Sequence, residues 1–479
     1  MRRYVGRAIF IYSLLMAALT GWALKPPNFI FFLSDDQTKV DYGCYGLPLN
    51  LTPVTDRLAE ESLVFEKMFT PQAICAPSRS SLFTGLYPIR HGCFLNHIET
   101  RSGTKTIYDA LKPLGYEVAL AGKVHVKPSS VYRWDRYIGS NGHAPLELDE
   151  IDAYLSTVKD KPFCLFITSS FPHGPYPADP EYPVEKTIVH PYMKAGQSHR
   201  LAGYYDNIAI KENELEQVLA MLKKQGLERN TVFVYSSDHG NGGRAKFTTY
   251  DTGLNVPFMV RWTGTIKPGR TDALASYVDV LPTFVELAGG APLLGVDGES
   301  FSRVLKNATA KHQKTVFGVM NQQGVWQAHI FPRRSARNER FHYIHNFNTL
   351  ERIQLDREAG KKIDPFRLLG AQQHPNTPEE ELYDTLTDPF ELVNLAGDPR
   401  LASMQATLKH TLFAWMEGQH DFLTEGGVIP YLKSDHPLDV DSGDIRPSMK
   451  HLYDCPAELE GTIKTYLDPH VLTDPANAR

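Results

Sequence analysis

The stretch NFIFFLSDD, residues 28–36, decides the fold of this chain. Residues 28–33 are almost continuously apolar, which is the pattern of a strand covered on both faces rather than on one. Similar runs follow at residues 117–121, 163–168, 231–235 and 256–261, with helical patterns at residues 55–62 and 202–225. Because strands alternate with helices in this order, we expect an open α/β sheet with helices on both sides.

Charged and polar side chains follow several of these runs where each strand ends. Asp35 and Asp36 follow the first run, and Asp238 and His239 follow residues 231–235. Other candidates after strands are Lys123, His125 and His173. Open α/β sheets bind ligands at the carboxyl ends of their strands, so these groups are expected to converge. The two pairs, with their hard oxygen ligands, predict a divalent-cation site.

The bulk composition and the amino terminus limit the class of protein. The net charge is −5 and charged residues make up 22%, which argues against a nucleic-acid surface. Arg2, Arg3 and Arg7 precede an apolar run at residues 8–19, and residues 1–23 are therefore predicted to be a secretory signal peptide. The run is shorter than the ~20 residues of a membrane span. We expect an exported protein without membrane insertion, periplasmic or secreted, or lysosomal in a eukaryote.

The cysteine count is odd, which in an exported protein indicates one thiol with a separate task. Cys75 is that candidate because Pro77 and Arg79 follow it closely, and a buried structural cysteine would need neither. The other cysteines are Cys44, Cys93, Cys164 and Cys455. They allow up to two disulfides or a set of buried thiols, and the sequence does not choose between these alternatives.

The character of the chain changes from about residue 318. A cluster of arginines, Arg333, Arg334, Arg337 and Arg340, precedes an alternating strand pattern at residues 341–347. A short strand at residues 381–384 and a helix at 399–417 follow. We therefore expect a catalytic domain over residues 24–321 and a smaller C-terminal α+β subdomain over 322–479, built on a short antiparallel sheet. The tail from residue 434 is rich in Asp and Pro and is expected to wrap around the surface.

The motif CAPSR at residues 75–79, followed by an apolar run and Thr84-Gly85, resembles the signature of the type I sulfatases of the alkaline phosphatase superfamily. The resemblance implies their fold, with a large mixed and mostly parallel sheet. It also implies that Cys75 is oxidised to formylglycine (3-oxoalanine), whose hydrated aldehyde is the nucleophile. A formylglycine-generating or an anaerobic sulfatase-maturating enzyme would carry out that oxidation.

The same resemblance assigns roles to the other polar residues. The metal ligands would be Asp35, Asp36, Asp238, His239 and modified residue 75. Arg79 would hold the formylglycine, and Lys123 and His173 would bind sulfate. His125 would contact the nucleophile and later help to eliminate sulfate. Either His173 or Lys246 would act on the leaving group. One divalent metal is expected, Ca²⁺ before Mn²⁺ or Mg²⁺, although the imidazole of His239 favours a transition ion. Ser78 and Arg79 are expected to begin the helix after the nucleophile, where amide dipoles favour an anion.

Residues 122–135 and 333–348 are similar to heparan N-sulfatases, which implies release of N-linked sulfate from glucosamine of heparan-type saccharides. His239 and Lys246 depart from that pattern, in which Asn and Arg stand at these positions, and Lys there is typical of O-sulfatases. The alternatives left open are an O-sulfatase on another polysaccharide, a phosphonate monoester or phosphodiester hydrolase, and a glycan-binding protein whose cysteine is never converted.

Residues that contact the sugar are the least constrained by sequence. The candidates are Asn96, His97, Arg333, Arg334, His345 and Asn348, and the arginines suit an acidic glycan. A solvated surface is the alternative for these residues. A homodimer is compatible with the sequence, but no pattern encodes the oligomeric state.

Overall fold

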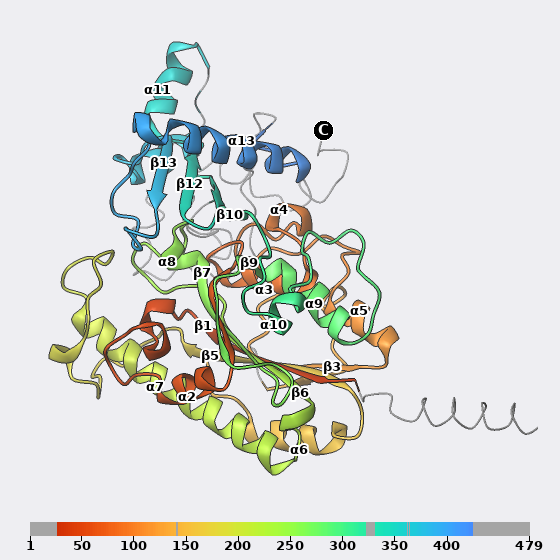
Figure 1. Cartoon of the computed structure of the whole chain (residues 1–479). Coiled ribbons are helices and arrows are strands. Elements are labelled where there is room, and N and C mark those ends of the chain that lie inside the picture. Colours follow the sequence, from red (N-terminus) through yellow and green to blue (C-terminus); the bar gives the residue numbers. More distant parts are fainter. Residues whose placement is uncertain (1–25, 140–141, 322–330, 362, 364, 425–479) are drawn as a thin grey trace, which may run out of the picture.

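The computed structural model describes residues 26–139, 142–321, 331–361, 363 and 365–424 (Figure 1). The predicted signal peptide, the tail from residue 434 and Cys455 lie outside the described residues. Among the described residues, no helix combines the length and the apolar character needed to cross a membrane.

The centre of the molecule is a nine-stranded sheet in the order β4-β3-β5-β1-β6-β7-β2-β8, with β9 paired to β2. The strands are β1 (Asn28–Asp35), β2 (Leu63–Phe69), β3 (Glu117–Gly122), β4 (Arg136–Ile138), β5 (Phe163–Pro172), β6 (Thr231–Ser237), β7 (Asn255–Arg261), β8 (Gly269–Thr271) and β9 (Ala275–Ser276). The first strand pairs in parallel with β5 on one side and β6 on the other. The predicted mixed, mostly parallel sheet is confirmed.

Two features of this sheet depart from the strand pattern that the sequence suggests. The run at 256–261 forms β7, which is antiparallel to both β6 and β2. Strand β2 was not predicted, because Glu66 and Lys67 interrupt its apolar residues. They lie where the register of β2 against β7 shifts, between Phe65 and Met68.

The side chains of β1 alternate between two hydrophobic cores, one on each face of the sheet. Phe29 and Phe31 pack in the core that contains residues of α3 (Cys75–Thr84), α5 (Ile107–Leu111), α9 (Val280–Leu287) and α10 (Ser302–Lys306). Ile30 and Phe32 pack in the core that contains residues of α2 (Pro53–Glu60), α6 (Leu148–Val158) and α7 (Ser198–Lys224). Figure 1 shows these two groups of helices on opposite sides of the strands. The continuous apolar run at 28–33 reflects this double coverage.

The C-terminal part forms a second, four-stranded antiparallel sheet in the order β10-β11-β12-β13. Its strands are β10 (Val316–Met320), β11 (Arg333–Arg337), β12 (Phe341–Asn346) and β13 (Glu380–Asp384), and its helices are α11 (Leu350–Glu358), α12 (Pro365–Gln373) and α13 (Ala402–Gly418). Leu408, Leu412 and Met416 of α13 share a buried cluster with Tyr343 and Leu382 of the sheet. Since β10 precedes residue 322, we propose that the subdomain begins near residue 315.

Arg333 and Arg334 do not lie on a solvated surface, which corrects that alternative for these two residues. Arg333, Arg334 and Arg337 lie on β11 and are buried, whereas Arg340 is exposed. Arg334 donates through Nε to Asp421 Oδ2 at 2.5 Å. A buried guanidinium needs such a carboxylate partner, and the sequence does not show where along the chain it comes from.

All four described cysteines, Cys44, Cys75, Cys93 and Cys164, are free thiols. Cys93 and Cys164 are buried in separate hydrophobic clusters. These positions agree with the buried-thiol alternative rather than with two disulfides.

Candidate active site

The site lies at the carboxyl edge of the central strands. Asp35 ends β1 and Asp36 follows it, while Asp238 and His239 follow β6 directly. Because β1 and β6 run in parallel with Ser34 opposite Ser237, the two pairs must lie side by side. The backbone N–H of Asp36 donates to Asp238 Oδ1 at 3.0 Å and joins them directly.

Helix α3 brings residue 75 to this edge, and it begins at Cys75 itself rather than at Ser78 or Arg79 as expected. Pro77 is tolerated because the N–H groups of the first turn have no partner within the helix. Every residue of α3 is buried, and Ser78 Oγ donates to the Asp238 carbonyl at 2.7 Å. The amide dipoles of the first turn therefore surround residue 75 and favour an anion there.

Arg79 joins three of the converging segments and is fully buried. Its Nη2 donates to Asp35 Oδ1 at 3.2 Å and to Asp238 Oδ2 at 3.1 Å. Its Nη1 donates to the carbonyl of Lys123 at 3.0 Å. Burial opposes the charge, but the two carboxylates outweigh it and raise the pKa of Arg79. The guanidinium is a fixed charge at the base of the site.

Four residues place possible metal ligands within 4.8 Å of one another, namely Asp36, Cys75, Asp238 and His239. Cys75 Sγ lies 3.2 Å from His239 Nε2 and 3.8 Å from Asp36 Oδ1. Asp36 has a φ of 62°, a strained value for a residue other than glycine, as occurs at functional sites. Buried carboxylates and an imidazole at this spacing fit a divalent cation.

Asp35, the fifth predicted metal ligand, is not in this group. Both of its oxygens are engaged, one by Arg79 and the other by Lys123 Nζ at 2.5 Å. Burial raises the pKa of Asp35, but the charges of Lys123, His173 and Arg79 outweigh burial and hold the pKa well below its usual value. Asp35 is therefore a carboxylate in this arrangement.

Two further predicted residues reach Asp36, His173 from the end of β5 and Lys246 from the segment between β6 and α8. Lys246 Nζ lies 2.7 Å from Asp36 Oδ2, and His173 Nε2 lies 3.5 Å from the same oxygen. Burial lowers the pKa of Lys246, but Asp36 more than compensates and raises it, so the amine stays charged. Basic groups therefore surround the carboxylates, as a site for an anionic group requires.

The predicted sugar contacts divide into two sets. Asn96 and His97 belong to the site, because Asn96 Oδ1 accepts from the N–H of Ala76 at 3.3 Å and His97 Nδ1 lies 3.2 Å from His125 Nε2. The others have partners elsewhere. Arg334 binds Asp421, Arg333 stacks on Phe331, His345 contacts Phe347 and Phe413, and Asn348 binds Arg367.

Several residues near the site are not indicated by any sequence motif. The ring of His143 stacks on that of His173 with centroids 4.6 Å apart. Arg200 donates to Asn241 Oδ1 at 2.8 Å and packs over the ring of Tyr176. Asn241 follows the pair Asp238-His239 by two residues, so proximity to that pair was the available signal for it.

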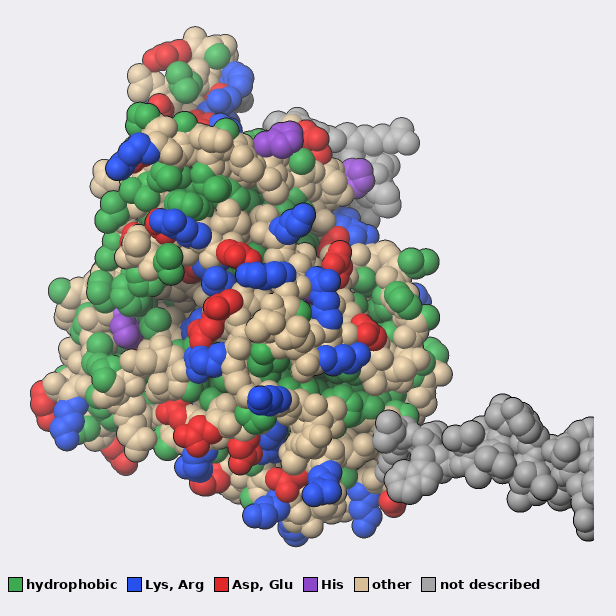
Figure 2. Space-filling model, in the orientation of Figure 1, with side chains coloured by type: hydrophobic (Ala, Val, Ile, Leu, Met, Phe, Trp, Pro, Cys, Tyr) green, Lys and Arg blue, Asp and Glu red, His purple; other side chains and the backbone are tan. Residues whose placement is uncertain are grey.

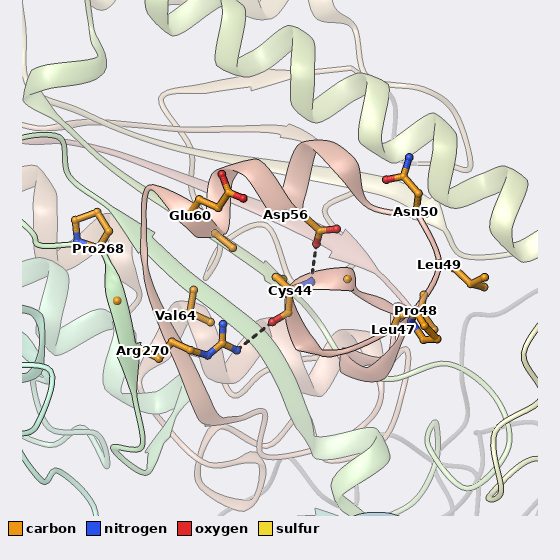
Figure 3. Close-up of a pocket in the computed structure, with 13 residues that line it drawn as sticks. Cys44, Leu47, Pro48, Leu49, Asn50, Asp56, Glu60, Val64, Pro268 and Arg270 are labelled. Carbon is orange, nitrogen blue, oxygen red and sulfur yellow. Dashed lines mark hydrogen bonds between the residues drawn. The ribbon is translucent and has the colours of Figure 1, made fainter.

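A separate surface pocket of about 770 Å³ lies between the 3₁₀ turn at Gly43–Tyr45, α2 and β8 (Figure 3). Asp56 accepts from the N–H of Cys44, and Arg270 donates to the Cys44 carbonyl. None of the residues that line it belongs to the predicted site. We therefore place the chemistry at the sheet edge, where the titratable groups converge.

Basic and acidic side chains are interspersed over the face of the molecule shown in Figure 2. The cations of the site are instead buried, since Arg79 is 0% and Lys123 is 7% exposed. A buried cation acts on an anion with less screening than a surface cation does. Recognition of a small anionic group within the site needs no extended basic surface on this face.

The carboxyl edge of this α/β sheet thus combines buried carboxylates and an imidazole that can hold a divalent cation with fixed cations that can hold an anion. A family model described as Sulfatase matches residues 27–291, and the chain belongs to this family. A second model, described as N-sulphoglucosamine sulphohydrolase, C-terminal, matches residues 242–365.

Three comparisons describe the relatives. An ulvan-active sulfatase of Formosa agariphila is 45% identical over 84% of this chain and 82% of its own length. Human N-sulphoglucosamine sulphohydrolase is 25% identical over 83% of this chain and 91% of its own length. A solved structure in complex with its substrate D-glucosamine-2-N,6-O-disulfate has a TM-score of 0.65 and 21% identity, and covers 83% of this chain and 99% of that one. The last likeness shows the fold alone.

Proposed function

We propose that this sulfatase hydrolyses O-linked sulfate esters of a sulfated polysaccharide of the ulvan type. The observation that carries the proposal is the 45% identity to an ulvan-active sulfatase over most of both chains. Lys246, which pairs with Asp36 at 2.7 Å, supports an ester rather than a sulfamate, because lysine at this position is typical of O-sulfatases. Arginine would present a planar fork of donors instead.

The residues of the site divide the reaction between them. Arg79, which binds Asp35 and Asp238, holds residue 75 next to these two carboxylates. Lys123 and His173 bind the sulfate oxygens, and Lys246 protonates the leaving oxygen. A divalent metal, when bound by Asp36, Asp238, His239 and residue 75 with Asp35 beside them, supplies Lewis-acid polarisation of the sulfate. We favour Ca²⁺ because of the carboxylate ligands, with Mn²⁺ or Mg²⁺ as alternatives.

Formylglycine at position 75 is part of the proposal, and it requires a maturation enzyme as a transient partner. Cys75 is 1% exposed, so the conversion must precede the packing of α3 into the core. We further propose that the chain is exported to the periplasm or the medium before it meets its polymeric substrate. This rests on the predicted signal peptide.

A second candidate is the release of N-linked sulfate from glucosamine of heparan-type saccharides. The match of residues 242–365 to the N-sulphoglucosamine sulphohydrolase C-terminal model favours it. The human sulphohydrolase also aligns over 91% of its own length. His239 and Lys246, which replace the Asn and Arg of that pattern, count against it.

The first test is sulfate release by protein shown by mass spectrometry to carry formylglycine at position 75. Ulvan oligosaccharides and N-sulfoglucosamine are compared by ion chromatography of free sulfate, with Cys75→Ala as the control. We expect release from the ulvan oligosaccharides only, and none from the variant. Release from N-sulfoglucosamine alone would establish the second candidate, and release that persists in Cys75→Ala would contradict both.

Removal of the metal tests the donor set. Dialysis against EDTA is expected to lower kcat by at least 10²-fold, in the range of lost charge stabilisation in a transition state. Calcium is expected to restore the rate better than manganese or magnesium. Full activity of protein that plasma emission spectroscopy shows to be metal-free would contradict the assignment of Asp36, Asp238 and His239 as ligands.

A further inference from the structure

We propose that Asn96 and His97 are positioning residues that fix the tautomer of His125, so that its buried Nδ1 carries the proton and is a hydrogen-bond donor. The sequence points to Asn96 and His97 as sugar contacts, and their hydrogen bonds indicate a different task. The tautomer rests on hydrogen bonds alone, whereas its effect on turnover rests on the proposed function.

The chain of hydrogen bonds begins at a group that can only be a donor. The backbone N–H of Ala76 is only a donor, and Asn96 Oδ1 accepts it at 3.3 Å. This contact settles the orientation of the Asn96 amide, so its NH₂ group faces His97 Nε2 at 3.1 Å. An amide NH₂ cannot accept a hydrogen bond. His97 Nε2 is therefore an unprotonated acceptor.

The next link follows from the chemistry of imidazole. A neutral ring carries one proton, so His97 holds its proton on Nδ1. This atom lies 3.2 Å from His125 Nε2. Since His97 Nδ1 donates, His125 Nε2 accepts. An imidazole nitrogen that accepts a hydrogen bond is unprotonated, so the ring of His125 is neutral and its proton is on Nδ1.

His125 Nδ1 is the free end of this chain. The atom is buried and has no hydrogen-bond partner among the described residues. An unpaired buried donor is unfavourable, so this orientation must be held by its surroundings. Both histidines have positive φ values, 63° at His97 and 48° at His125, and such strain persists only where the surroundings impose it.

The origin of the chain at Ala76 has a consequence for the reaction. Ala76 follows the residue that carries the nucleophile, and it lies in the first turn of α3. The same turn therefore sets the nucleophile and, through Asn96 and His97, the proton on His125. In this tautomer Nδ1 can donate a hydrogen bond, but it cannot act as a base in the first step.

A matched pair of substitutions at His97 tests the assignment. The side-chain amide of His97→Asn places a donor where Nδ1 lies, and His97→Asp places an acceptor of nearly the same shape there. Full-length protein labelled with [¹⁵N]histidine is studied by NMR, and the His125 signals are identified by their loss in His125→Gln. We expect the proton on Nδ1 in the wild type and in His97→Asn, and on Nε2 in His97→Asp.

Three results would overturn the proposal: a wild-type His125 protonated on Nε2, a mixture of both tautomers, or a His97→Asp spectrum unchanged from the wild type. If His97→Asp does not fold, as judged by circular dichroism, the wild type and His97→Asn still decide the tautomer. These spectra need no substrate, so they stand whether or not the proposed function holds.

Turnover gives the second readout. With ulvan oligosaccharides, kcat is expected to fall about tenfold more in His97→Asp than in His97→Asn, as for residues that orient a reacting group. Equal losses of kcat in the two variants, with the tautomers as expected, would confine the role of His97 to structure and overturn the catalytic part of the proposal.

Discussion

Arg79 shows how much of the active site depends on single side chains that are fully buried. Its guanidinium donates to Asp35, to Asp238 and to the carbonyl of Lys123, and these three segments are far apart in the sequence. Buried carboxylates are tolerated only when such partners are present. Arg79 therefore contributes to the fold as well as to the charge of the site.

Arg79→Met is expected to lower the free energy of unfolding by about 3–5 kcal/mol, because it leaves buried carboxylates without their partner. Urea unfolding, followed by fluorescence in the presence of a chelator, measures this change without a contribution from metal.

The matched control for that experiment is Arg57→Met. Arg57 pairs with Glu216 on the surface, where the two side chains are 59% and 61% exposed. Its loss is expected to cost less than about 1 kcal/mol. Equal losses for the two variants would refute a special role for burial at Arg79.

Helices α2 and α7 illustrate how elements are held at the sheet. Glu212 of α7 accepts from the N–H groups of Val54 and Thr55 at 2.7 and 3.0 Å, and so caps the first turn of α2 from outside that helix. Lys211 Nζ lies 2.5 Å from the same carboxylate. Burial raises the pKa of Glu212, but Lys211 and the other hydrogen bonds outweigh it, so the pKa is lowered. One buried carboxylate thus links two helices.

Glu212→Gln is expected to cost about 3–5 kcal/mol above pH 5, because Lys211 then lacks its countercharge. The folded-state pKa of Glu212 is depressed, so its contribution is fully present above the unfolded pKa and is lost as pH falls below it. The stability of the variant should therefore converge on that of the wild type in acid. Urea unfolding at a series of pH values measures both effects.

Glu216→Gln, on the exposed face of the same helix, is the control for Glu212→Gln. It should change the stability by less than about 0.5 kcal/mol. A wild type and a Glu212→Gln variant that differ equally at every pH would contradict the linkage described here.

The two sheets of the molecule meet at a buried charged cluster. Asp251 begins the short helix α8 (Asp251–Leu254), and its backbone N–H donates to Glu391 Oε2 at 2.6 Å. Arg337 of β11 donates to Asp251 Oδ2 at 2.9 Å, and His342 of β12 contacts Glu391 at 2.5 Å. Glu391 and Asp251 are thereby paired with Arg337 and His342. The cluster joins the segment that follows Lys246 to the C-terminal sheet.

Arg337→Met is expected to loosen this junction, because Asp251 loses its countercharge in a buried place. We expect a loss of about 3–5 kcal/mol of stability and, in differential scanning calorimetry, separate transitions for the two sheets. Arg340→Met, which affects an exposed arginine that pairs with Asp384, should change the stability much less. A single sharp transition with unaltered midpoint in Arg337→Met would show that the cluster does not couple the sheets.

Much of this molecule could be predicted from local patterns. Apolar runs such as residues 28–33 identified central strands. A strand that is covered on both faces has no solvent-facing side, so polar and apolar residues do not alternate along it. Polar pairs such as Asp35-Asp36 and Asp238-His239 could be recognised as candidates since each stands at the end of its strand. The motif around Cys75 identified the family before any contact was known. Strand β2 and the start of α3 were missed, because Glu66 and Lys67 break the apolar pattern and Pro77 suggests a later helix start.

The class of enzyme follows from the resemblance of the motif around Cys75 to a known family. The edge of the sheet where the candidate residues gather follows from their order along the chain. The partners of buried charges follow only from the tertiary structure. Arg334 with Asp421, and Arg337 with Asp251, look like surface arginines in the sequence, and they are buried because a distant carboxylate meets each one. The same holds for His125, whose tautomer depends on Asn96 and His97. Hydrogen bonds and ion pairs are decided by distances of a few ångströms between segments, and spacing along the chain does not encode those distances.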